Sequence, residues 1–112
     1  MHPEIKVWLK DIEISIIEIR EFMPSGSTFT DFKKDIKSRK AIERNIEIIG
    51  EAMKRILEID PDIFISDSRK IVDTRNRIIH GYNNISADVI WLILTRNLPV
   101  LEKEVKDFLA KE

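Results

Sequence analysis

The sequence contains no cysteine, so disulfide bonds, thiolate nucleophiles and cysteine-ligated metal sites are all excluded. Turn-forming residues are scarce as well, with 3 glycines and 4 prolines among 112 residues. A sheet of many short strands needs frequent turns, so this scarcity favours helices. Long hydrophobic runs are also missing. The longest, from Val89 to Leu94, is far too short to span a bilayer.

Neither sign of charge predominates, because 19 basic and 20 acidic side chains leave a formal net charge of -1. The chain as a whole therefore does not attract nucleic acid, and any RNA site must be a local basic patch. The N-terminal residues show no apolar signal-peptide core, so we expect a cytoplasmic protein with no membrane contact. The length and the 43% of hydrophobic residues predict a single helical domain over residues 1–112.

Four segments carry apolar residues at spacings of three and four, which is typical of amphipathic helices. We expect these helices at about residues 3–23, 30–57, 66–81 and 86–109, separated by turn-forming segments. Helices of this length with short connections pack against their sequence neighbours. The predicted fold is therefore an all-α, antiparallel four-helix bundle with up-down topology.

Individual residues refine these boundaries. Thr30 and Ser86 are expected to be N-caps, and the stretch around Ser38 is a candidate interruption of the second helix. Pro99 lies inside the last helix and predicts a kink or a split, because proline has no N–H to donate. Gly50 costs about 1 kcal/mol relative to alanine inside a helix, and a closely approaching neighbour is one reason to tolerate it.

The third helix contains an arginine where a core residue is expected. On an ideal helix, Arg75 falls near the middle of an apolar arc formed by Ile71, Val72, Ile78, Ile79 and Tyr82. Burying an unpaired guanidinium is costly, so Arg75 needs a carboxylate, a subunit interface or a cleft that admits an anion. The residue types favour a structural ion pair with an acid of the second helix, namely Glu43, Glu47 or Glu51.

His80 falls on the opposite side of the same helix, together with Asn76. Asn76 precedes it by four residues, so its amide can orient the imidazole. Taken alone, a surface or capping histidine is the commoner interpretation. Because Arg75 and His80 face opposite sides, a site that contains both needs either a helix that unwinds before Gly81 or a cleft to which two subunits contribute.

Read together, the residues Arg75-Asn-Arg-Ile-Ile-His80-Gly-Tyr82 resemble the signature of the HEPN superfamily: arginine, four residues, histidine, one residue, tyrosine. The segment Ala41–Ala52 resembles the second helix of the HepT-like proteins in that superfamily. The segment Asp88–Leu101, with its internal Pro99, resembles their final helix. The similarity thus covers three of the four expected helices in the expected order.

This resemblance implies a metal-independent endoribonuclease without a cofactor, acting as the toxin of a toxin–antitoxin pair. It implies a homodimer or higher oligomer whose third helices line a shared cleft. It also implies a partner, a minimal nucleotidyltransferase antitoxin (MntA-like) that inhibits the toxin by transferring AMP from ATP to the motif tyrosine. That tyrosine corresponds to Tyr82 in this sequence.

For the chemistry, we hypothesise that the 2′-hydroxyl of the RNA attacks the adjacent phosphate, which needs no metal ion. His80 would transfer a proton as general base or general acid, since its unperturbed pKa lies near neutrality. Arg75 would bind the scissile phosphate, and Asn76 would orient His80 or contact the phosphate. The predicted RNA-binding residues are Arg69, Lys70 and Arg77.

Two other interpretations stay open. One is a non-catalytic helical module that presents a substrate or nucleotide to a nucleotidyltransferase partner, and the other is a purely structural dimer in which Arg75 forms an internal ion pair. A metal hydrolase fits least well, because the only histidines are His2 and His80 and no acidic residues with ligand spacing accompany them.

Overall fold

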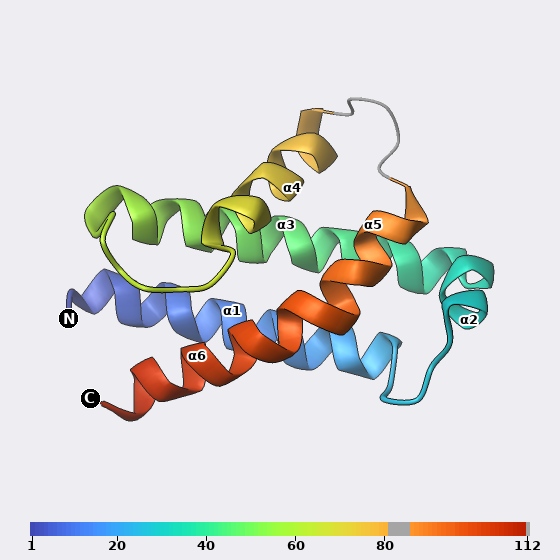
Figure 1. The fold of residues 1–112 in the computed structure, drawn as a ribbon, viewed down its shortest axis with the longest axis horizontal. Coiled ribbons are helices and arrows are strands. Elements are labelled where there is room, and N and C mark those ends of the chain that lie inside the picture. Colours follow the sequence, from blue (N-terminus) through green and yellow to red (C-terminus); the bar gives the residue numbers. More distant parts are fainter. Residues whose placement is uncertain (81–85, 112) are drawn as a thin grey trace.

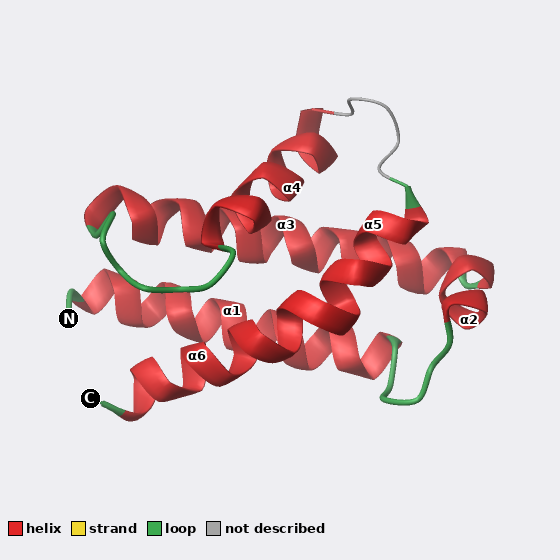
Figure 2. Cartoon of the chain, viewed as in Figure 1, coloured by secondary structure: helices red, strands yellow, loops and turns green. Residues whose placement is uncertain are grey.

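The computed structural model describes residues 1–80 and 86–111, and this part of the chain is helical with connecting turns and no strand (Figure 2). The predicted all-α class is confirmed. The helices are α1 (Pro3–Phe22), α2 (Phe29–Lys34), α3 (Ile36–Ile59), α4 (Ser68–His80), α5 (Ala87–Leu92), the π-helical turn η1 (Ile93–Asn97) and α6 (Leu98–Ala110). No described helix is long and apolar enough to cross a membrane.

The two longest helices, α1 and α3, lie side by side and antiparallel, and they form the backbone of the bundle (Figure 1). Helix α6 packs on α1, whereas α4 packs on α3 and leans away from the other helices towards its C-terminal end. The start of α4 is fixed to α6, because Glu104 accepts hydrogen bonds from the backbone N–H of Ser66 at 3.1 Å and from its hydroxyl at 2.9 Å. Helix α4 is thus anchored at one end and packed on one side.

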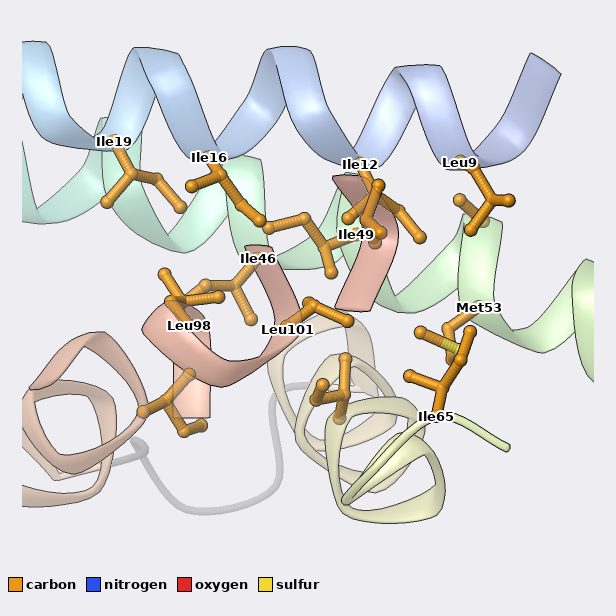
Figure 3. Packing of buried hydrophobic residues seen from close by; sticks show 14 of the residues in the cluster. Leu9, Ile12, Ile16, Ile19, Ile46, Ile49, Met53, Ile65, Leu98 and Leu101 are labelled. Atoms are coloured by element: carbon orange, nitrogen blue, oxygen red, sulfur yellow. The ribbon is translucent and has the colours of Figure 1, made fainter. Parts of the chain in front are cut away.

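The core lies where α1, α3 and α6 meet, and Figure 3 shows its interlocking side chains. Its most deeply buried members are aliphatic and alternate at helical spacing along α1 (Leu9, Ile12, Ile16, Ile19) and α3 (Ile42, Ile46, Ile49, Met53, Ile56). Burial of each such side chain contributes roughly 1.5–3 kcal/mol. This stripe pairing fixes α3 and therefore the platform on which α4 rests.

The second expected helix is divided into α2 and α3 at Asp35, three residues before the predicted interruption at Ser38. Asp35 caps α3 by accepting hydrogen bonds from the backbone N–H of Ser38 at 3.0 Å and from its hydroxyl at 2.6 Å. The prediction of Thr30 as an N-cap was wrong. Thr28 is the cap instead, because it forms a reciprocal capping box with Asp31.

The last expected helix is divided as Pro99 predicts. Without an N–H, Pro99 cannot donate to the carbonyl of Thr95, and the chain takes the wider π-helical turn η1 immediately before α6. Ser86 occupies the predicted N-cap position of α5 in an extended conformation, but its side chain makes no capping hydrogen bond within the described part of the chain.

Both aspartate caps link stability to pH. Hydrogen bonds from the backbone N–H and then the side chain of Thr28 lower the pKa of Asp31 below its ordinary value of 3.8. The side chain and then the backbone N–H of Ser38 lower the pKa of Asp35 in the same way. A carboxylate with a lowered pKa stabilises the fold above its ordinary pKa and loses that contribution as the pH falls through the lowered value.

We therefore expect the Tm of the double variant Asp31→Asn/Asp35→Asn to fall less than that of the wild type between about pH 5 and pH 2, as measured by circular dichroism. Asp62→Asn removes an exposed carboxylate outside both caps, so it is the matched control, and its Tm should depend on pH as in the wild type. An unaltered acid slope in the double variant would contradict the role of the caps.

Candidate functional site

Arg75 lies where α4 packs tightly against α3. The crossing point is Gly50, and a Cβ placed there would lie 2.2 Å from Cβ of Arg75 and 3.2 Å from the carbonyl oxygen of Ile71. Real side chains do not approach that closely, so only glycine permits the observed packing. The close approach that the sequence suggested for Gly50 is confirmed, and its partner is the candidate catalytic arginine.

The guanidinium of Arg75 is held by two neighbours. Its Nη2 atom lies 2.5 Å from Oε2 of Glu51, and its Nη1 atom donates a hydrogen bond of 2.8 Å to Oδ1 of Asn76. The predicted ion pair with an acid of the second helix is confirmed, and among the three candidates the acid is Glu51. The side chain of Arg75 is 17% exposed, so it is neither fully buried nor free in solvent.

Glu51 serves two arginines at once. Its Oε1 atom accepts a hydrogen bond of 3.1 Å from Nε of Arg55, while its Oε2 atom faces Arg75. Oε2 is itself buried and, within the described residues, accepts no aligned hydrogen bond, so its contact with Arg75 is a charge contact only. One carboxylate shared by two guanidinium groups leaves local positive charge at this point.

A groove of about 350 Å³ opens beside Arg75. Helix α3 forms its floor, and α1 and α4 supply its walls. The groove brings together an apolar surface and six charged side chains of both signs. Its lining consists of Trp8, Asp11, Arg44, Glu47, Ile48, Glu51, Ala52, Arg55, Arg75 and Ile79.

His80 ends α4 on the other side of the helix. Five positions separate it from Arg75, which corresponds to about 140° around an ideal helix and about 7.5 Å along it. His80 is exposed and does not line the groove beside Arg75, whereas Ile79 does. Within the described residues, Arg75 and His80 therefore lie on different sides of α4.

The predicted supporting residues are divided between these two sides. Asn76 contacts Arg75 through its amide oxygen. Lys70 and Arg77 are exposed and, seven residues apart, lie on one side of α4. Arg69 is exposed too and lines a second groove of about 340 Å³ between α3 and α4, beside Lys54, Leu57, Glu58, Val72 and Asp73. Tyr82 lies outside the described residues.

The groove also contains residues that the sequence did not point to. The apolar periodicity of the first helix allows either Trp8 or Leu9 in its stripe, and nothing in that pattern indicated that Trp8 and Asp11 share a groove with Arg75. Such a contact depends on how far α4 tilts over α3. No group of three His, Asp or Glu side chains placed to hold a metal ion occurs in the part of the chain that the structure describes.

Comparison with known proteins identifies the family to which the chain belongs. Residues 12–108 match the family model described as Ribonuclease HepT-like. A protein named "Putative RNase" from Caldanaerobacter subterraneus is 33% identical over 98% of this chain and 95% of its own length. One named "Probable ribonuclease HepT" from Thermococcus cleftensis is 34% identical over 87% of this chain and 88% of its own. No solved structure matches the chain.

The contact at Gly50 predicts a reversal of the usual effect of a helical substitution. Glycine to alanine inside a helix ordinarily stabilises by about 1 kcal/mol. We expect Gly50→Ala to destabilise the fold by about 1–3 kcal/mol instead, because the added methyl group overlaps Arg75 and must displace α4. Urea unfolding measures the difference in the free energy of unfolding. Lys40, exposed on the same helix, provides the ordinary value through Lys40→Gly and Lys40→Ala. The same gain in the free energy of unfolding from glycine to alanine at positions 50 and 40 would show that α4 tolerates the methyl group.

Proposed function

The chain belongs to the HepT-like ribonuclease family and is an RNA endonuclease, and from this premise we propose that it cleaves RNA without a metal ion, through the substrate's own 2′-hydroxyl. In this reaction a bond forms between the 2′-oxygen and phosphorus while the bond to the 5′-oxygen breaks. The 2′-hydroxyl loses a proton and the leaving 5′-oxygen gains one. DNA lacks the 2′-hydroxyl and would not react.

Arg75 is the residue that binds the phosphate in this proposal. The observation that carries it is a part-exposed guanidinium held in a groove wall by Gly50, Glu51 and Asn76. A guanidinium fixed in advance stabilises the charge that develops on the phosphate oxygens without having to reorganise. Its planar fork also matches a phosphate better than an ammonium group does. The shared carboxylate of Glu51 keeps the group in place while leaving it only partly neutralised.

His80 is the proton-transfer group, either as the base for the 2′-hydroxyl or as the acid for the leaving 5′-oxygen. Such catalysis is worth roughly 10²- to 10⁴-fold. Because Arg75 and His80 leave α4 on different sides, we propose that the active cleft forms between two copies of the chain, with their α4 helices paired. Among the described helices α4 packs chiefly on α3, which is consistent with this, since it leaves one side of α4 for a partner. The exposed cations Arg69, Lys70 and Arg77 would bind the flanking RNA.

Control by a partner protein completes the proposal. We assign the chain the role of a toxin whose antitoxin is a minimal nucleotidyltransferase that transfers AMP from ATP to Tyr82. The phenol oxygen would attack the α-phosphate and release pyrophosphate. The attached AMP would place an anion two residues from His80, where it repels substrate phosphate and competes for the arginine.

A non-catalytic module that presents substrate to a nucleotidyltransferase is the second candidate. The ion pair between Arg75 and Glu51 favours it, since a paired arginine can serve stability alone. Exposed pairs contribute about 0–1 kcal/mol, whereas breaking a buried pair costs about 3–5 kcal/mol. This partly buried pair lies between those limits, so both stability and activity must be measured for every variant at Arg75.

We expect His80→Ala to reduce RNA cleavage by about 10²- to 10⁴-fold, and Arg75→Lys by about 10²- to 10³-fold, with little change in Tm for His80→Ala. Cleavage is measured on a labelled RNA in the presence of EDTA. Arg96→Lys, an exposed arginine in η1, is the matched control and should cleave normally. Equal cleavage by His80→Ala and the wild type would leave only the non-catalytic module.

Mixing the two inactive variants tests the shared cleft. If arginine comes from one chain and histidine from the other, a mixed dimer of Arg75→Lys and His80→Ala regains one intact site out of two. We expect the co-refolded mixture to recover cleavage well above either variant alone. Recovery no greater than the sum of the two variants would show that each chain supplies both groups itself.

Incubation with the cognate nucleotidyltransferase and ATP should add one AMP to Tyr82 and abolish cleavage. Intact-protein and peptide mass spectrometry locate the adduct, and Tyr82→Phe should stay unmodified and resist inhibition. A chain that stays unmodified, or an adduct on another residue, would contradict this form of control.

A further inference from the structure

The groove beside Arg75 has an apolar surface, formed by α1 and α3, that the proposed reaction does not use. Trp8, Ile48 and Ala52 line it, and Trp8 is partly buried and packed against the core. A tryptophan fixed in this way offers a flat surface whose orientation costs little further entropy to use. Aromatic side chains of this kind are the usual stacking partners of unpaired RNA bases.

The charges of the groove differ from one wall to the other. At the α4 wall, Arg75 shares the single carboxylate of Glu51 with Arg55 of the floor, which leaves an excess of positive charge. On the floor, Arg44 and Glu47 lie 3.4 Å apart and offset each other.

At the α1 wall, Asp11 is exposed and forms no ion pair or hydrogen bond with its side chain among the described residues. The groove is therefore positive at the side of Arg75 and negative beside Trp8.

A groove with one positive and one negative side fits a single nucleotide, whereas a segment of several phosphates would need a groove that is positive throughout. A phosphate fits the positive side, where Arg75 lies, and a base that carries an amino group fits the side where a carboxylate can accept from it. The volume of about 350 Å³ is near the lower end of the range for small-molecule sites, roughly 300–1,000 Å³, which suits a single nucleotide.

We propose that the groove holds the nucleotide next to the scissile phosphate, with its base packed against Trp8 and its amino group donating to Asp11. The proposal rests on the cleavage at Arg75 proposed above. It makes Trp8 and Asp11 specificity-determining residues, and it predicts that cytosine is preferred to uracil at this position, because uracil has no amino group.

The fluorescence of Trp8 can report on binding in the groove, because the chain contains 2 tryptophans and the second one can be replaced. The other, Trp91, packs against the rings of Phe29 and Phe32 at centroid distances of 6.0 and 5.7 Å and does not line this groove. The Trp91→Phe variant leaves Trp8 as the only reporter, and Trp8→Phe leaves Trp91 as the matched control. The probes are short 2′-O-methyl oligocytidylate and oligouridylate, which cannot undergo attack by the 2′-oxygen.

In the Trp91→Phe protein we expect oligocytidylate to change the Trp8 emission saturably and at lower concentration than oligouridylate. Asp11→Asn in the same background should remove most of that preference. In cleavage assays, Trp8→Leu should raise KM about tenfold while kcat changes much less, because stacking binds the substrate without touching the reacting atoms. Circular dichroism checks that Trp8→Leu is folded, and the emission titration with Trp8 intact does not depend on that variant.

The outcomes separate this inference from the cleavage proposal. Normal RNA cleavage with no change in Trp8 emission on adding either oligonucleotide overturns the inference but not the cleavage proposal. A saturable Trp8 response in a chain that leaves RNA intact overturns the cleavage proposal and leaves the groove as a nucleotide site. If the Trp8 emission changes with protein concentration but not with oligonucleotide concentration, a second chain fills the groove, which also overturns the inference.

Discussion

The contact between α3 and α4 at Gly50 governs the position of the motif arginine. Because position 50 has no side chain, α4 approaches until Cβ of Arg75 occupies the space that a Cβ on residue 50 would need. This close approach places the guanidinium beside Glu51, the next residue of α3, at 2.5 Å. The packing of the two helices at Gly50 thus sets how deep Arg75 lies in the groove, and the carboxylate of Glu51 sets the direction of its guanidinium. Both depend on α3, whose buried stripe packs on α1 and shares one core with residues of α6.

The same arrangement explains why the two motif residues lie on different sides of α4. A helix that rests on a neighbour along one side must present residues five apart to different surroundings. Arg75 faces α3, while His80 ends the helix in an exposed position on the other side. The shared cleft proposed above would join these two surroundings, with Arg75 supplied by one copy and His80 by the other.

Much of this could be predicted from the sequence, where local rules apply. Helical periodicity gave the helix class and the approximate boundaries, Pro99 predicted the division of the last helix, and the apolar arc around Arg75 predicted its carboxylate partner. The cap at Thr28 was missed because Thr28 and Thr30 are both good capping residues, and only the reciprocal bond with Asp31 decides between them.

Trp8 and Asp11 were missed for another reason. The side chains that meet in the groove come from three helices, and local sequence patterns do not specify the crossing angle that brings them together. The choice of Glu51 over Glu43 and Glu47 depended on the same angle. Contacts of this kind become predictable only when the positions of neighbouring helices are known.

The π-helical turn η1 has a consequence for how the chain tolerates length changes. The buried apolar residues Ile93 and Leu98 are five positions apart, and a turn with one extra residue lets both face the same core. A deletion of one residue inside η1 would return the segment to ordinary α-helical winding, in which buried positions four apart face the same side. Leu101 and Val105 would stay in the interior, and Glu104 would keep its hydrogen bonds to the loop that precedes α4. A deletion within α6, where the winding is already α-helical, would instead rotate everything that follows by about 100°. The anchoring of α4 therefore tolerates a loss of length in η1 but not in the helix that follows it.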